Sequence, residues 1–185
     1  DQAVVFDIES FPNVFTIHVE SLFGNFFSTW EISEFRNDKP QLFEWLNYMY
    51  QTQTPMIGFN SEHYDYPLLH WIYKNPHCTA ADIYRKSKEL IDPARNRFAD
   101  TIWPRDRFAP QIDLFKIFHF DNKAKTTNLK ALQINMRSDN VVESAVPFDT
   151  WVSQHLIDHG FTQCRVNQHE AHKPTLKRIP VCPTV

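Results

Sequence analysis

The stretch that decides the fold is Val4-Val5-Phe6-Asp7-Ile8-Glu9. Its apolar residues are interrupted only by Asp7 and Glu9, a pattern typical of a central strand buried on both faces. These two carboxylates stand two positions apart, so in a strand both side chains leave on the same face. Because paired carboxylates repel each other, the pair favours an oxygen-liganded cation such as Mg²⁺ or Mn²⁺. Solvated strand-end carboxylates are the simpler explanation of an isolated D-x-E.

The rest of the chain alternates between strand-like and helix-like patterns. The elements expected after the first strand are strands at 14–19 and 23–30, a helix at 33–50, a strand at 56–59, helices at 66–73 and 80–91, a strand at 111–118, and helices at 127–136 and 149–159. This order predicts an α/β fold with a mixed central sheet flanked by helices. We expect one domain over residues 1–185, with a weaker pattern from about residue 160.

Composition excludes some classes of protein. No apolar run is long enough to span a membrane, and the N-terminus lacks the pattern of a signal peptide. The three cysteines are odd in number and irregularly spaced, which argues against a disulfide framework and predicts a reducing, cytoplasmic compartment. The net charge of −3 disfavours a pure nucleic-acid-binding module, which usually carries a basic stripe. An enzyme that holds cations in an acidic pocket is compatible with this charge.

A second motif raises the weight of Asp7 and Glu9. Residues 58–69 read G-F-N-S-E-H-Y-D-Y-P-L-L, and D-I-E followed by G-F-N-x-x-x-Y-D-x-P-L-L resembles the first two motifs of the DEDD 3′–5′ exonucleases, the proofreading superfamily. The resemblance is strongest to the exonuclease domains of bacteriophage DNA polymerases, through Q-I-D-L at 111–114, N-L-K-A-L-Q at 128–133 and V-P-F-D at 146–149. It covers roughly residues 3 to 159.

The resemblance implies an RNase H-like fold and a two-metal nuclease that removes nucleotides from a DNA 3′ end. Asp7, Glu9 and Asp65 would then bind two Mg²⁺ or Mn²⁺ ions. The implied substrate-binding residues are Asn60 and Tyr64, which would line the cleft, with Ser10 touching the terminal nucleotide. Asp100 and Asp113 are reserve carboxylates. The expected partners are single-stranded DNA or a DNA 3′ end, together with a polymerase or another replication protein.

The third motif of the family is absent, because neither Tyr-x-x-x-Asp nor His followed five residues later by Asp occurs near the end of the chain. One register places Gln163 and Asn167 where the family has Tyr and Asp, and sliding by three residues offers Glu170 instead. This departure leaves two alternatives open. The chain is a 3′–5′ exonuclease, or it is a degenerate exonuclease-fold module that binds nucleic acid or a replication partner without cleaving. DNA and RNA substrates are not distinguished by the sequence.

Overall fold

The computed structural model describes residues 3–94, 96, 100–119, 129 and 147–153. Within them lies a five-stranded sheet in the order β3-β2-β1-β4-β5. Its strands are β1 (Val4–Ser10), β2 (Val14–Ser21), β3 (Phe27–Ser33), β4 (Met56–Gly58) and β5 (Gln111–Asp113). β1, β2 and β3 pair antiparallel as a meander, whereas β4 and β5 run parallel to β1. The mixed sheet expected from the sequence is therefore confirmed.

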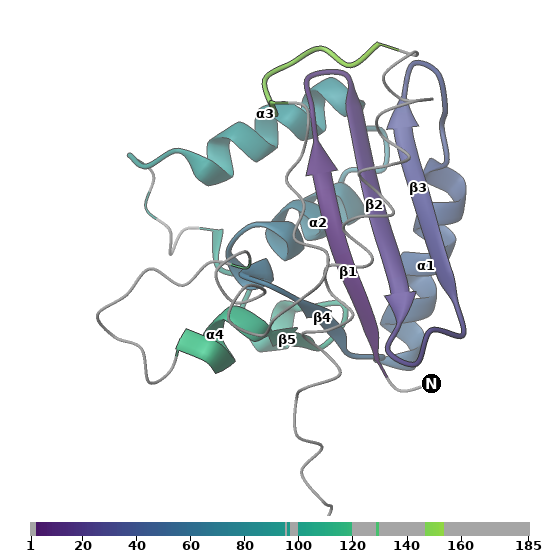
Figure 1. Ribbon diagram of the computed structural model, residues 1–185, viewed down its shortest axis with the longest axis vertical. Coiled ribbons are helices and arrows are strands. Elements are labelled where there is room, and N and C mark those ends of the chain that lie inside the picture. Colours follow the sequence, from purple (N-terminus) through teal and green to yellow (C-terminus); the bar gives the residue numbers. More distant parts are fainter. Residues whose placement is uncertain (1–2, 95, 97–99, 120–128, 130–146, 154–185) are drawn as a thin grey trace, which may run out of the picture.

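Helices accompany this sheet. They are α1 (Lys39–Thr52), α2 (Asp65–Lys74), α3 (Ala80–Ile91) and α4 (Leu114–His119), with short 3₁₀ turns η1 (Ser61–His63) and η3 (Pro104–Asp106). Figure 1 shows α1 and α2 behind the β1–β3 meander, with the long strands in front of them. A mixed sheet with flanking helices confirms the α/β class and is consistent with an RNase H-like fold. None of the helices in the described ranges is both long and apolar enough to cross a membrane.

Local sequence signals explain where the helices begin and end. Pro40 lies in the first turn of α1, where its missing N–H costs nothing. The helix ends at Gln53, whose backbone is left-handed at φ 53° and whose N–H bonds the carbonyl of Met49. α3 begins with a capping box, in which the Thr79 side chain accepts from the Asp82 N–H and the Asp82 carboxylate accepts from the Thr79 N–H.

Alternate residues of the meander divide it into two faces. One face is apolar and packs against the helices, and its residues are Val4, Phe6, Ile8, Phe15, Ile17, Val19, Trp30 and Ile32. Residues directly opposite in neighbouring strands share a face. Asp7 pairs with His18 and Glu9 with Thr16, while Thr16 pairs with Glu31 and His18 with Thr29. We call these six residues the polar face.

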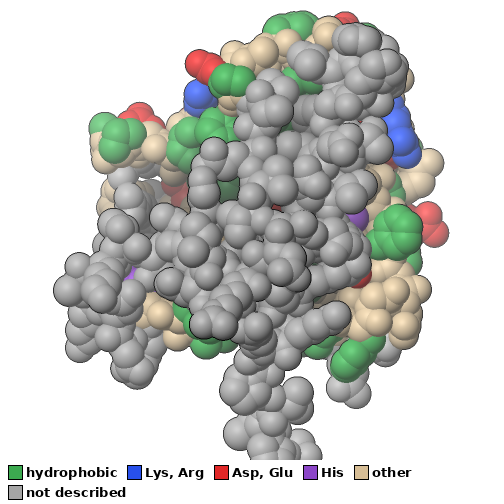
Figure 2. All heavy atoms as spheres, in the orientation of Figure 1, with side chains coloured by type: hydrophobic (Ala, Val, Ile, Leu, Met, Phe, Trp, Pro, Cys, Tyr) green, Lys and Arg blue, Asp and Glu red, His purple; other side chains and the backbone are tan. Residues whose placement is uncertain are grey.

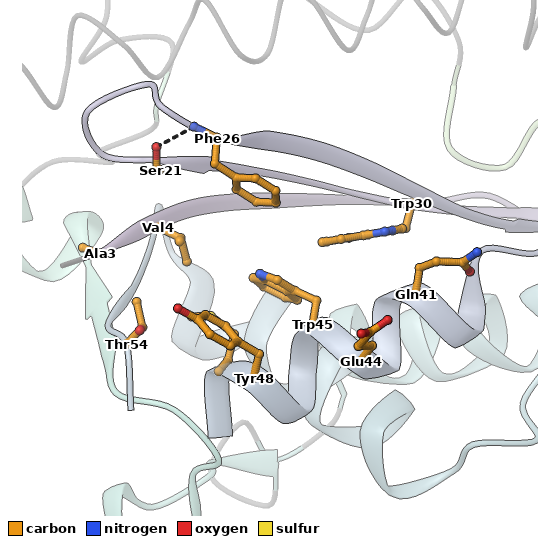
Figure 3. Close-up of a pocket in the computed structure, with 11 residues that line it drawn as sticks. Ala3, Val4, Ser21, Phe26, Trp30, Gln41, Glu44, Trp45, Tyr48 and Thr54 are labelled. Carbon is orange, nitrogen blue, oxygen red and sulfur yellow. Dashed lines mark hydrogen bonds between the residues drawn. The ribbon is translucent and has the colours of Figure 1, made fainter. Parts of the chain in front are cut away.

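A cavity of about 520 Å³ opens where the apolar face meets α1. Figure 3 shows Phe26 and Trp30 reaching into it from the sheet side, with Trp45 and Tyr48 entering from α1. The two tryptophan rings lie 5.2 Å apart between centroids and are tilted by 38°. Glu44 is the only charged side chain among its described lining residues. This cavity belongs to the apolar side of the fold.

Two predicted elements are wrong in the described residues. The strand expected over 111–118 ends at Asp113, and α4 follows it directly. The cause is a cap, because the Asp113 carboxylate accepts from the Phe115 N–H and thereby starts the helix. The helix expected from Asp149 is absent over 149–153, where Asn13 instead exchanges two side-chain hydrogen bonds with the backbone of Val152. The rest of that helix, and nearly all of the one expected over 127–136, lie outside the described residues.

Candidate functional site

The site lies where the parallel strands end. β4 and β5 are only three residues long, and β4 pairs with β1 through Val4–Met56 and Val5–Ile57. β1 therefore continues beyond the end of β4, and this extension carries Asp7 and Glu9. The carboxyl ends of parallel strands are where α/β sheets usually place their ligands. The chain leaving β4 returns through η1 to the first residue of α2, which is Asp65.

The negative charges of Asp7 and Glu9, from the first motif, act on Asp65, from the second. Asp65 is 8% exposed, and its burial raises the pKa of its carboxyl well above the usual range. The negative charge of Asp7 raises this pKa further, and Glu9 and Asp113 add smaller contributions in the same direction. The backbone hydrogen bond at Asp65 opposes them in part. The structure thus places Asp65 within reach of the negative charges of Asp7 and Glu9.

Tyr64 adjoins the same carboxylates but is anchored on α3. Its hydroxyl lies 2.6 Å from the hydroxyl of Ser87, a buried residue in the second half of that helix. Burial raises the pKa of Tyr64 to about 12, against the effect of the Ser87 hydrogen bond, and the charges of Asp65, Glu9 and Asp7 contribute to the rise. The phenol is therefore protonated at neutral pH and acts as a hydrogen-bonding group.

Asn60 and Tyr64 both line a cavity of about 260 Å³, and Tyr64 directly precedes Asp65 in the chain. The cavity lies between η1 and the C-terminal end of α3. Its described lining is Asn60, His63, Tyr64, Leu90, Ile91, Asp92, Pro93 and Asp100. It is smaller and more polar in composition than the cavity beside Trp30 and Trp45, and Asp7, Glu9 and Asp65 are not among its described lining residues. Asp100, a reserve carboxylate in the sequence, is part of its wall and lies 3.5 Å from the amine of Lys86.

Ser10 occupies a different position from the other predicted site residues. It is 5% exposed and lies one residue beyond Glu9, so the alternation of β1 directs its side chain to the face opposite Asp7 and Glu9. Its hydroxyl has no hydrogen-bond partner among the residues that the structure describes. The structure therefore brings Asp7, Glu9, Asn60, Tyr64 and Asp65 together and leaves Ser10 apart from them.

Asp113 is a functional candidate whose role the sequence did not reveal. Its carboxylate is 4% exposed and accepts hydrogen bonds from the backbone N–H groups of Asn60 at 2.7 Å and Glu62 at 3.2 Å. Glu62 itself bonds Arg107 and Lys116, both at 2.6 Å. The sequence does contain a signal for this role, because an Asp followed by an amphipathic stretch is typical of a helix N-cap. The interpretation of residues 111–118 as one strand left that signal unused.

Asp7, Glu9 and Asp65 have the right ligand atoms for a divalent cation, but their side chains are not arranged as a formed metal site. Carboxylate oxygens of Asp7, Glu9 and Asp65 are the ligand type that Mg²⁺ and Mn²⁺ prefer, and their mutual repulsion would be relieved by a cation. As the side chains stand, no three His, Cys, Asp or Glu residues in the described part of the chain form a group that could hold a metal ion. Gln163, Asn167 and Glu170, the alternatives for a fourth position, lie outside the described residues.

Figure 2 shows part of the basic surface of the described residues. In Figure 2 the described Lys and Arg side chains on this face of the molecule occupy separate small groups near its edges. Arg107, which lies near η1, is 13% exposed at its side chain and is engaged by Glu62.

Comparison with known proteins supports the fold. The structure is similar to that of a family B DNA polymerase from the hyperthermophilic archaeon Pyrobaculum calidifontis, with a TM-score of 0.55 and 16% sequence identity. The match covers 95% of this chain and 24% of the polymerase chain, so this chain spans about a quarter of that protein's length. No family model and no curated protein matches the sequence. At this identity the likeness concerns the fold alone.

Proposed function

We propose that this chain is a metal-dependent 3′–5′ exonuclease domain that hydrolyses the terminal phosphodiester of DNA. The observation that carries the proposal is that Asp7 and Glu9 lie on the part of β1 that extends beyond β4, while Asp65 opens α2 close enough for their charges to raise its pKa. A purely structural role explains this poorly, because a buried carboxyl beside two others destabilises the fold unless a cation compensates. The likeness to a DNA polymerase supports DNA as the substrate class.

In this proposal the residues of the chain divide the work. Asp7, Glu9 and Asp65 would hold two Mg²⁺ or Mn²⁺ ions. When bound, such ions lower the pKa of an attacking water and stabilise the leaving 3′ oxygen. Asn60 lines the cavity that Tyr64 shares, and in the proposal its exposed side chain contacts the terminal nucleotide there. Tyr64, fixed by Ser87, forms the adjoining wall and keeps its proton.

The test uses the purified chain and a 5′-labelled single-stranded DNA, with Mg²⁺ or Mn²⁺ present. The expected result is a ladder of products shortened from the 3′ end, with release of 5′-mononucleotides that stops in Asp7→Ala and Asp65→Ala. The exposed Asp106, which forms an ion pair with its neighbour Arg105 at 3.5 Å, provides the control Asp106→Asn. Intact DNA after incubation with wild-type protein and Mn²⁺ would refute the exonuclease proposal.

A second candidate is a non-cleaving module that binds single-stranded DNA or a replication protein. The observation that favours it is the absence, among the described residues, of a three-residue group already placed to hold a metal. It predicts DNA binding without cleavage and no heat of Mn²⁺ binding in calorimetry. Under the exonuclease proposal, Mn²⁺ binds the wild type and the binding is lost in Asp65→Ala. A role within or beside a larger polymerase fits either candidate.

A further inference from the structure

The carboxylate of Asp113 joins two segments that are far apart in sequence. Oδ1 accepts from the N–H of Asn60 at 2.7 Å and of Phe115 at 3.0 Å, and Oδ2 accepts from the N–H of Glu62 at 3.2 Å. Three backbone donors compensate a side chain that is 4% exposed, which is how a buried carboxylate is tolerated. Because both oxygens are occupied by the backbone, Asp113 is poorly suited to be a metal ligand and well suited to hold a loop.

The loop that Asp113 holds, residues 58–62, has a backbone conformation that few residue types can adopt. Gly58 pairs with Asp113 in the sheet, and a Cβ added at position 58 would lie 2.5 Å from the Cβ of Ser61, so only glycine allows the approach. Asn60 follows with a left-handed backbone at φ 58°, a conformation that Asn adopts more readily than most residues. The short turn η1 leaves its first N–H groups without partners of its own. Asp113 supplies the acceptors for this turn.

A second set of contacts fastens the same loop. The Glu62 carboxylate bonds Arg107 and Lys116, so the side chain of Glu62 is tied to α4 and to the segment before β5 while its N–H is tied to Asp113. The loop leads within three residues to Tyr64 and Asp65. Its position therefore fixes where Asn60 and Asp65 stand relative to Asp7 and Glu9 on β1.

We propose that Asp113 is the positioning residue of the site, which sets the geometry of Asn60 and Asp65 through the η1 backbone without touching substrate or metal. The inference rests on the proposed exonuclease function. It assigns to Asp113 a role distinct from that of a reserve ligand. A displacement of about 1 Å in a reacting group is enough to cost about 10²-fold in rate, so a loosened loop has a large expected effect.

The experiment compares Asp113→Ala, Asp113→Asn and the control Asp106→Asn in the full chain. For Asp113→Ala we expect kcat on single-stranded DNA to fall by about 10²-fold with little change in KM. Calorimetric Mn²⁺ affinity should fall by about 10- to 100-fold, as is usual when a residue supporting metal ligands is lost. Asp113→Asn keeps Oδ1 for Asn60 and Phe115 but turns a donor toward the Glu62 N–H, so its losses should be intermediate.

Hydrogen exchange adds a local readout that does not depend on activity. The amides of Asn60 and Glu62 should exchange faster in Asp113→Ala, while the amide of Ile17 in β2 should keep its protection. Leu46→Ala, a core variant in α1, serves as the control for lost stability. At a temperature where it stays folded, it should keep both kcat and Mn²⁺ affinity.

The outcomes separate this inference from the proposed function. A wild type that neither cleaves DNA nor binds Mn²⁺ refutes both. A wild type that binds Mn²⁺ without cleaving leaves the inference to be decided by Mn²⁺ affinity and amide exchange. Active wild-type protein with unchanged kcat and Mn²⁺ affinity in Asp113→Ala overturns the inference alone. Equal losses in Asp113→Ala and Leu46→Ala, at matched loss of Tm, overturn it as well, because they show a general effect of stability.

Discussion

Phe6 and Asp7 are neighbours in the sequence, but their side chains leave β1 on opposite faces of the sheet. Phe6 is 2% exposed and packs among the helices, where burying such a side chain contributes about 1.5–3 kcal/mol. Asp7 lies on the polar face and raises the pKa of Asp65 by its charge. One strand thus stabilises the fold with one face and concentrates repulsive charge on the other. Stability and the proposed activity therefore depend on alternate residues of β1, and single substitutions can change one without the other.

Asp65→Asn should give the largest effect, a loss of activity without a loss of stability. It keeps the shape of the side chain and removes a carboxylate, and losing several kcal/mol of transition-state stabilisation at about 1.4 kcal/mol per tenfold lowers kcat/KM by about 10³-fold. Stability should hold or rise in EDTA at pH 7, because the raised pKa shows that the folded protein disfavours the charged form. Cleavage assays and thermal unfolding measure the two effects. A fall in Tm without loss of activity would contradict the division between the faces.

Leu46→Ala should produce the opposite result on the apolar face. Leu46 is fully buried on α1, and removing its side chain leaves a cavity that costs about 2–5 kcal/mol in the free energy of unfolding. Denaturant unfolding measures this loss, with the exposed Gln51→Ala on the same helix as the matched control. Cleavage per folded molecule should remain close to that of wild type. A loss of kcat in Leu46→Ala under conditions where the variant is fully folded would show that the apolar face also determines the geometry of the site.

Substitutions at Tyr64 and Ser87 measure how much their hydrogen bond stabilises the packing of α3 against the segment that carries Tyr64. Tyr64→Phe leaves the buried Ser87 hydroxyl without its partner, and Ser87→Ala does the same to the phenol, so each should cost about 1 kcal/mol. The double variant should cost less than the sum, and a double-mutant cycle from urea unfolding gives the coupling energy. Strict additivity would mean that the 2.6 Å contact does not stabilise the docking of α3.

Glu62→Gln should give the smallest effect, visible as a change in pH dependence. Burial raises the pKa of Glu62, but hydrogen bonds and charges from Lys116 and Arg107 outweigh it and bring the pKa below its ordinary value of 4.5. Because the unfolded chain has the higher pKa, this contribution is present above about pH 4.5 and is lost as the pH falls through the lower, folded pKa. As the pH falls, the free energy of unfolding of the wild type should therefore decrease by about 1 kcal/mol or less through loss of this contribution. Glu62→Gln never has the contribution, so its stability should not show this decrease. Thermal melts between pH 3 and 7 measure it, and parallel curves for both proteins would contradict it.

The fold was largely predictable because its signals are local. The apolar run at Val4, the alternation of the meander and the helical spacing around Leu46 each describe one element. The predicted boundaries failed where a side chain bonds a distant or following backbone group. Asp113 caps α4 and so ended a strand expected to continue to 118, and Asn13 binds Val152 across a span of 139 residues. Hydrophobic periodicity carries no information about such bonds.

The site was predictable in part for a related reason. Asp7, Glu9, Asn60, Tyr64 and Asp65 occur in two recognisable motifs, and the structure gathers them at one end of the sheet. Ser10 directly follows Glu9 in the sequence, but the alternation of β1 directs its side chain to the opposite face of the sheet. The role of Asp113 and the ion pairs of Glu62 needed the tertiary structure, because their partners are backbone amides and side chains 45 to 54 residues away.

The pairing pattern of the sheet also bears on the order of folding. β1, β2 and β3 join residues that are close in the chain, and Ser10 already faces Phe15 across the first turn. The parallel half must instead close long loops, from Val4 to Met56 and from Gly58 to Asp113, which is slower because chain entropy opposes it. We therefore expect the meander to form first and Asp65 to arrive at Asp7 and Glu9 late. The repulsive cluster of charge is then assembled only after the apolar face has begun to pack.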